Sequence, residues 1–262
     1  MHPLVNIAVS AARAAGNQIM RSLDRVDTLQ IERKSRNDFV TQVDRNAERE
    51  IINIIHKAYP EHAILAEEGG AQGDNEVVWI IDPLDGTTNF LHGIPHFAVS
   101  IGIQYRGRLE HGVIYAPCTQ DLYCASRGTG ATLNNRRIRV SNCKDMDSAL
   151  IGTGVPLREE NLDRYLPMLR NVAAQTAGVR RAGSASLDLA YVAAGRLDAF
   201  WELGLKPWDM AAGIVLVQEA GGMVSELYGK EDMLATGNIL AAHAKFHPLV
   251  EKCLLGSAIS AS

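Results

Sequence analysis

Trp79-Ile80-Ile81-Asp82-Pro83-Leu84-Asp85-Gly86-Thr87-Thr88-Asn89-Phe90 is a short apolar run that ends abruptly in two carboxylates. The β-branched residues Val77–Ile81 predict a buried strand. Pro83 has no N–H and fixes φ, so the chain leaves this strand in one defined direction. Gly86 allows the backbone to approach a ligand closely, and the polar residues after it are suited to open a helical turn. Because open α/β sheets bind ligands where strands end, we expect a site here.

A purely structural turn is the alternative interpretation, since Asp-Pro and Asp-Gly are common turn dipeptides. Against it, Asp82 and Asp85 are close enough to repel each other unless a cation lies between them. A second acidic pair, Glu67-Glu68, follows the apolar segment 63–66, and Asp209 opens an apolar helix far downstream. Oxygen ligands gathered from several segments suit a hard cation such as Mg²⁺.

Composition indicates a soluble globular protein. The chain has 262 residues, 47% of them hydrophobic and 21% charged, which is enough for one large domain or for two fused layers of sheet and helix. The net charge of −4 argues against autonomous binding to DNA or to an anionic membrane. No apolar run approaches the roughly 20 residues that a membrane span needs.

The four cysteines form no CxxC pair and show no zinc spacing with histidine, so we expect reduced thiols and a cytoplasmic location. Residues 1–6 lack the pattern of a signal peptide. His92 and His96 have a zincin-like spacing, but Gly93 and Pro95 between them disfavour a helix. The absence of a GxxxxGK[ST] loop argues against ATP use.

Periodicity predicts the remaining elements. Leu4 to Leu23 reads as an amphipathic helix, 24–37 as a loop or weak hairpin, and Asp44 as the cap of a helix that begins at Arg45. One antiparallel sheet in the N-terminal half is predicted from the segments 97–103, 112–115 and 122–125, together with a hairpin of 131–133 and 137–140 around Asn134-Asn135. Further helices are expected at 162–174, after Gly183, from Asp209 and at 247–255. Further strands are expected at 179–181, 197–202, 223–225 and 238–242, followed by a frayed tail at 256–262.

Three motifs together resemble those of the inositol monophosphatase family, in the family's order and over nearly the whole chain. They are residues 79–95, residues 207–222 (Pro207-Trp208-Asp209-Met210-Ala211-Ala212-Gly213, continuing to Gly222) and residues 38–44. The resemblance implies a layered αβαβα sandwich of α/β (α+β) class, as one unit over 1–262. Residues 1–145 would form an α+β part with most metal ligands, and 146–262 an α/β part. It also implies a homodimer, Mg²⁺ as cofactor and inhibition by Li⁺.

The resemblance further implies roles for individual residues. The metal ligands would be Glu67, Asp82, the Leu84 carbonyl, Asp85 and Asp209, with Asp82 bridging two ions. The catalytic residues would be Glu67 and Thr87, which position and help to deprotonate the attacking water, with Asp44 behind Thr87. The substrate-binding residues would be Leu84, Asp85, Gly86, Thr87, Arg181, Gly183, Ser184, Ala185, Glu202 and Asp209. Simple helix capping remains the alternative for Ser184, and a dimer interface for Arg181.

The function that the resemblance implies is hydrolysis of myo-inositol 1-phosphate by in-line attack of an activated water. A phosphatase of the same superfamily would instead act on fructose-1,6-bisphosphate, adenosine 3′,5′-bisphosphate or NADP. A third possibility is a binding factor of transcription antitermination complexes on ribosomal RNA operons, with RNA polymerase and antitermination factors as partners. The basic surface for that role would include Arg136, Arg137 and Arg139, or Arg180 and Arg181, unless these are simply solvated charges.

Overall fold

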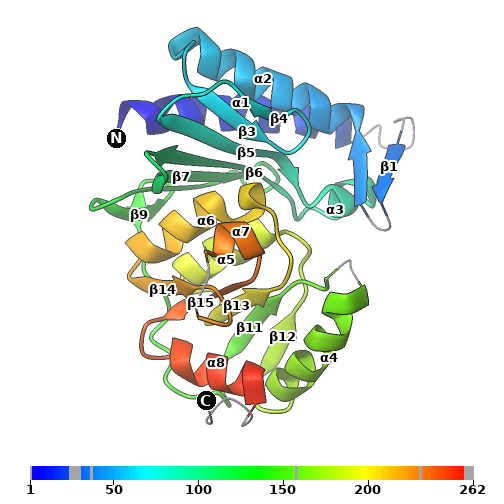
Figure 1. Ribbon diagram of the computed structural model, residues 1–262, viewed down its shortest axis with the longest axis vertical. Coiled ribbons are helices and arrows are strands. Elements are labelled where there is room, and N and C mark those ends of the chain that lie inside the picture. The colour runs from blue at the N-terminus through cyan, green and yellow to red at the C-terminus, as the bar shows by residue number, and fades with distance from the viewer. Residues whose placement is uncertain (1, 24–30, 36–37, 157–158, 230–231, 257–262) are drawn as a thin grey trace.

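Helices and sheets alternate in five layers along the long axis of the molecule (Figure 1). The structure is a computed structural model that describes residues 2–23, 31–35, 38–156, 159–229 and 232–256. From the N-terminal end of Figure 1 the order is α1 and α2, a large sheet, α5 and α6, a smaller sheet, then α4 and α8. The expected layered αβαβα sandwich is therefore confirmed.

The large sheet carries the stretch with the two carboxylates. Within the described residues it has eight strands in the order β10-β9-β8-β7-β6-β5-β3-β4. Their bounds are β3 (Ala63–Ala66), β4 (Gly70–Gln72), β5 (Val77–Asp85), β6 (Ala98–Tyr105), β7 (Arg108–Ala116), β8 (Asp121–Ser126), β9 (Gly130–Leu133) and β10 (Arg136–Arg137). Two further strands, β1 (Ile31–Ser35) and β2 (Asp38–Thr41), form a separate antiparallel hairpin.

The smaller sheet lies in the C-terminal half, with the strand order β12-β11-β13-β15-β14 among the described residues. Its strands are β11 (Leu150–Thr153), β12 (Gly178–Arg180), β13 (Ala199–Glu202), β14 (Gly222–Ser225) and β15 (Ile239–His243). The helices are α1 (Pro3–Leu23), α2 (Gln42–Ala58), α3 (Thr87–Leu91), α4 (Glu159–Ala173), α5 (Ala185–Ala193), α6 (Pro207–Glu219), α7 (Met233–Thr236) and α8 (His247–Leu255). None of the described helices is long and apolar enough to cross a membrane.

Each interface between layers buries its own apolar cluster. Ile19, Ile51 and Trp79 belong to the cluster between the first two helices and the large sheet. A second cluster joins both sheets through α5 and α6, which are apolar all round, as expected for helices covered on two sides. The third cluster includes Tyr165 and Trp201 and lies under α4 and α8. The middle helices therefore belong to the cores of both sheets.

Two paired glycines place α6 against the large sheet. Gly102 on β6 lies opposite Gly112 on β7. A Cβ added at Gly102 would lie 2.7 Å from the side chain of Ala211, and one at Gly112 would collide with the backbone of Ala212. The absence of side chains at both glycines lets α6 pack directly on the strands, which brings Asp209, in its first turn, to the end of β5.

The strands predicted between 97 and 140 pair antiparallel as expected, as β6 to β10, whereas β3, also in the large sheet, pairs in parallel with β5. Two other sequence predictions need correction. Helix α2 begins at Gln42, so Asp44 lies inside its first turn and is not the cap of a helix that starts at Arg45. The hairpin around Asn134-Asn135 is present with both residues at positive φ, but its second strand is only Arg136–Arg137. Of the predicted loop, 24–30 and 36–37 lie outside the described residues, as does the tail after 256.

Candidate active site

The site begins at an irregularity near the end of β5. Asp82 pairs with Ser100 on β6 and Asp85 pairs with Ala98, with a shift of register between the two pairs. Pro83 and Leu84 occupy this irregular segment, where the missing N–H of Pro83 is tolerated. Such an irregularity re-aims the side chains around it. Both carboxyl groups are consequently buried at one end of the sheet.

One oxygen of each aspartate is fixed by a protein donor. Asp82 Oδ1 accepts a hydrogen bond from the N–H of Leu84 at 3.0 Å, and Asp209 Oδ2 accepts one from the N–H of Lys206 at 2.7 Å. Asp85 Oδ2 accepts from Ser184 Oγ at 2.6 Å, from the N–H of Ser186 at 2.8 Å and from Ser186 Oγ. No hydrogen bond from the described residues reaches the second oxygen of these three carboxylates.

Burial and mutual repulsion disfavour the charged forms of these groups. Burial raises the pKa of Asp82 well above its usual range, and the charges of Glu67, Asp85 and Asp209 raise it further. Burial also raises the pKa of Asp209 well above its usual range, with Asp85 as the next cause. The pKa of Asp85 is raised by burial, although its bonds from Ser184 and Ser186 oppose the shift. A cluster of this kind is stabilised by a bound cation.

The donor set fits a hard cation in chemistry, but not in its present side-chain positions. The candidate ligands are all oxygens, which suits Mg²⁺ better than a softer metal. Within the described part of the chain, however, no three His, Cys, Asp or Glu side chains are arranged to hold one ion as they stand. Coordination by Glu67, Asp82, Asp85 and Asp209 therefore requires some of these side chains to rotate. The four groups do interact electrostatically, since, in addition to burial, the charges of Glu67 and Asp85 raise the pKa values of both Asp82 and Asp209.

Thr87 links the end of β5 to α2. Its Oγ1 lies 2.9 Å from Asp44 Oδ1 and 2.9 Å from the carbonyl oxygen of Leu84. Gly86 precedes it with φ of 94°, a conformation that favours glycine, and an added Cβ would lie 3.1 to 3.3 Å from His96, Gly183 and Phe97. The predicted arrangement of Asp44 next to Thr87 is thus present.

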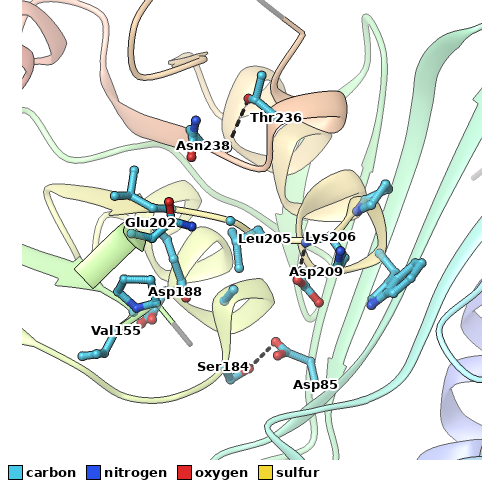
Figure 2. A pocket seen from close by; sticks show the side chains of 18 of the residues that line it. Asp85, Val155, Ser184, Asp188, Glu202, Leu205, Lys206, Asp209, Thr236 and Asn238 are labelled. Atoms are coloured by element: carbon cyan, nitrogen blue, oxygen red, sulfur yellow. Dashed lines mark hydrogen bonds between the residues drawn. The ribbon is translucent and has the colours of Figure 1, made fainter. Parts of the chain in front are cut away.

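A pocket of about 1080 Å³ opens beside these groups. Figure 2 shows Asp85 and Asp209 on one side of it and Asp188 and Glu202 on the other. Eight of the predicted site residues line it: Glu67, Asp85, Arg181, Gly183, Ser184, Ala185, Glu202 and Asp209. The other five, Asp44, Asp82, Leu84, Gly86 and Thr87, are not among the lining residues. They contact or neighbour the lining residues along β5, α2 and α3.

The far wall of the pocket comes from α5 and β13. Ser184 is the N-cap of α5, and its Oγ accepts a hydrogen bond from the N–H of Leu187 at 3.4 Å, so the capping interpretation is confirmed alongside the bond to Asp85. Glu202 ends β13. Burial, followed by the charges of Asp188 and Asp85, raises the pKa of Glu202 to about 8, which Arg181 partly opposes.

Sequence reasoning missed several lining residues, most importantly Asp188. It lies within the apolar helix α5, and its side chain is 2% exposed. The signal was present, since a lone carboxylate inside the apolar run Leu187–Ala190 is unusual unless it has a task. Ser186, which binds Asp85, was also missed, because only the folded chain brings it to β5.

Comparison with known proteins agrees with this architecture. The sequence profile of the inositol monophosphatase family matches residues 1–257. A protein of Pseudomonas aeruginosa named "Nus factor SuhB" is 57% identical over 252 residues, covering 94% of this chain and 93% of that protein. The extragenic suppressor protein suhB from Bartonella henselae is 45% identical in sequence. Its crystal structure matches this one with a TM-score of 0.95, covering 98% of this chain and 100% of that one.

An inositol monophosphatase from Anabaena is 39% identical, with a TM-score of 0.83 over 96% of this chain and 95% of that one. Identity at this level over nearly full length, together with the profile match, settles the family. The resemblance drawn from the three sequence motifs is confirmed, and the chain belongs to the inositol monophosphatase family.

Proposed function

We propose that this protein is a Mg²⁺-dependent phosphatase that releases phosphate from myo-inositol 1-phosphate. The observation that carries the proposal is the set of buried aspartates at the end of β5 and the start of α6, next to a polar pocket. Three carboxylates that disfavour one another's charge, each with one oxygen fixed and one available, offer oxygen ligands to divalent cations. Family membership supports the same reaction class.

Bound Mg²⁺ would supply charge neutralisation at the phosphoryl oxygens and a water of lowered pKa. The ligands from this chain would be Glu67, Asp82, the Leu84 carbonyl, Asp85 and Asp209. The carbonyl oxygen of Leu84 lies 2.9 Å from Thr87 Oγ1, and it retains a lone pair for a cation even when it accepts from that hydroxyl.

Thr87 and Asp44 would handle the proton of the attacking water. When Thr87 donates its hydrogen to Asp44 Oδ1, its oxygen is left as an acceptor for the water. Glu67 would accept a hydrogen from the same water on the other side. Gly86 and Thr87 would offer their backbone to the phosphate, and Arg181, Gly183, Ser184, Ala185 and Glu202 would contact the alcohol portion.

A substrate panel tests this proposal against the related phosphatases. Phosphate release is measured from myo-inositol 1-phosphate, fructose-1,6-bisphosphate, adenosine 3′,5′-bisphosphate and NADP, each with and without Mg²⁺ and with added Li⁺. We expect Mg²⁺-dependent, Li⁺-sensitive turnover of myo-inositol 1-phosphate above the other three. Faster turnover of a bisphosphate or of NADP would identify that compound as the preferred substrate in place of myo-inositol 1-phosphate. Metal-independent turnover would refute the proposed chemistry.

We propose a second function, as a factor in transcription antitermination complexes, because the Pseudomonas aeruginosa relative is named a Nus factor. Arg136, Arg137 and Arg139 are exposed and offer a basic surface near β9. Binding to purified RNA polymerase with antitermination factors tests it, using wild type, Arg137→Glu and the metal-site variant Asp82→Asn. Binding by wild type and Asp82→Asn, but not by Arg137→Glu, supports a role separate from catalysis. Absence of binding by wild type refutes the second function. The expected homodimer and cytoplasmic location remain predictions.

A further inference from the structure

The pocket contains a second acidic pair that the proposed phosphatase chemistry does not use fully. Asp188 lies on α5 and Glu202 ends β13, and both line the pocket on the side away from Asp209 (Figure 2). The Asp188 side chain is 2% exposed, and its Oδ1 is enclosed without a hydrogen-bond partner among the described residues. An enclosed acceptor without a donor is costly and rare in folded proteins.

A glycine directly after strand β11 leaves the space that the Glu202 carboxylate occupies. Gly152 lies in β11, and Gly154, two residues further on, follows the end of the strand. A Cβ added at Gly154 would collide with the Glu202 carboxylate. One added at Gly152 would meet Asp188 Cγ at 3.6 Å, and the side chains of Leu197 and Phe200 more closely. The space that holds the Glu202 carboxylate is thus left open by Gly154, and Asp188 lies at contact distance from the position of the missing side chain of Gly152.

The chemistry of the pair indicates what it binds. Two neighbouring carboxyl groups present acceptor oxygens. Burial raises the pKa of both groups and the charge of Arg181 lowers it, but among the described residues Arg181 forms no ion pair with either. Hydroxyl groups are donors that satisfy such acceptors without adding charge. An enzyme site built to bind a hydroxyl discriminates strongly against ligands that lack it, because its polar groups are then left without partners.

We propose that Asp188 is a specificity-determining residue that acts with Glu202 to accept hydrogen bonds from two neighbouring hydroxyl groups of the substrate's polyol portion. This inference rests on the proposed phosphatase function for Glu202, and it adds Asp188 as the second acceptor. The site would then select polyol phosphates with adjacent hydroxyls over phosphates of simple alcohols, while phosphate binding remains the task of the β5 end.

Ligand binding tests the inference separately from turnover. Calorimetry with the Mg²⁺-loaded full-length protein measures Kd for myo-inositol and for inorganic phosphate, using wild type, Asp188→Leu, Asp188→Asn and the exposed control Asp163→Asn. Because a hydrogen bond to a carboxylate is stronger than one between neutral groups, Asp188→Leu should weaken the binding of myo-inositol by about tenfold or more. Phosphate binding should stay within about twofold, and Asp163→Asn should match wild type.

The variants differ in a way that a purely structural role would not reproduce. Asp188→Leu removes an enclosed carboxyl without a partner, so we expect a melting temperature equal to or above that of wild type. Asp188→Asn keeps one acceptor oxygen and should lose less affinity for myo-inositol than Asp188→Leu. Should Asp188→Leu fail to fold, Asp188→Asn still provides the comparison of myo-inositol with phosphate.

Three results overturn the inference: unchanged affinity for myo-inositol in both variants, a parallel loss of affinity for myo-inositol and for phosphate, or no measurable binding of myo-inositol to wild type. Kinetics then separate the two proposals. If wild type hydrolyses none of the phosphomonoesters while the Asp188 variants lose myo-inositol selectively, the phosphatase proposal fails and the role of Asp188 stands. If wild type is active and the variants keep the wild-type KM for myo-inositol 1-phosphate, the role of Asp188 fails.

Discussion

The two acidic walls of the pocket have similar charge but different contacts. On the β5 side, Asp82, Asp85 and Asp209 each have one oxygen fixed by a protein N–H or hydroxyl. On the α5 side, Asp188 Oδ1 is enclosed without a partner among the described residues. Fixed carboxylates that repel one another are suited to a cation, whereas unpartnered acceptors are suited to hydroxyl donors. The presence of acidic residues therefore does not by itself indicate which ligand they bind. The hydrogen bonds that each carboxylate already accepts from the protein must also be considered.

The largest effect should follow from changing Asp82 to Asn. Asp82 is one of the proposed Mg²⁺ ligands, and its loss would take away metal-supplied stabilisation of several kcal/mol, so kcat for myo-inositol 1-phosphate should fall on the order of 1000-fold. The buried charge of Asp82 is unfavourable in the metal-free protein, so the melting temperature of metal-free Asp82→Asn should not be below that of wild type. Phosphate-release kinetics and thermal unfolding check both statements, with Asp163→Asn as the matched control. Retained turnover would remove Asp82 from the metal site.

A smaller loss is expected for Thr87→Val, which is close in shape but lacks the hydroxyl. The variant removes the donor to Asp44 and the acceptor for the attacking water. General acid–base contributions of this kind are about 100-fold or more, so kcat should fall by about 100-fold with little change in KM. Thr87→Ser, which keeps the hydroxyl, should restore most of the activity. Equal losses in the two variants would indicate a packing role for Thr87.

Ser186→Ala should have a milder effect, on metal affinity. The side chain and the N–H of Ser186 both bind Asp85 Oδ2, and these bonds oppose the rise in the pKa of Asp85 that burial causes. Losing the hydroxyl should raise that pKa further and weaken Mg²⁺ activation by about tenfold. The Mg²⁺ concentration for half-maximal activity, measured across pH, checks this. Ser148→Ala, at an exposed serine, is the control, and an unchanged Mg²⁺ requirement would contradict the prediction.

Local patterns predicted the elements of the fold well. The apolar stripe from Leu4 to Leu23 predicted α1, and Asn134-Asn135 predicted a tight hairpin that is present with positive φ at both residues. These features depend on neighbours in sequence, so a periodicity or a turn dipeptide reveals them. The helix start assigned at Arg45 was wrong, because α2 begins at Gln42 and the first turn includes Asp44.

Contacts between distant segments were not visible in the same way. The parallel pairing of β3 with β5 and the bonds from Ser184 and Ser186 to Asp85 depend on how the layers close over each other. The family resemblance implied Asp85, Ser184 and Glu202 as site residues, and all three line one pocket. The resemblance did not imply Asp188, whose only sequence signal is its place in an apolar run, and its enclosure beside the pocket is visible only in the folded chain.

The smallest effect is a change in how stability depends on pH. Burial first, then Asp188 and Asp85, raise the pKa of Glu202 from 4.5 to about 8 in the folded protein. Between these two values the folded state retains a proton that the unfolded state has released, so this group's contribution to stability is fully present below about pH 4.5. It is lost as the pH rises through about 8.

Glu202→Gln removes this titration while keeping the shape of the side chain. Urea unfolding of metal-free protein at pH 5, 6, 7 and 8 should therefore show a shallower decline in the free energy of unfolding for Glu202→Gln than for wild type, with Asp163→Asn following wild type. The other raised pKa values, of Asp82 and Asp209, remain in the variant, so a residual decline is expected. An identical slope in Glu202→Gln and wild type would mean that Glu202 is already charged in the folded state. The α5 wall would then resemble the β5 end in needing a cation, and the contrast between the two walls would be lost.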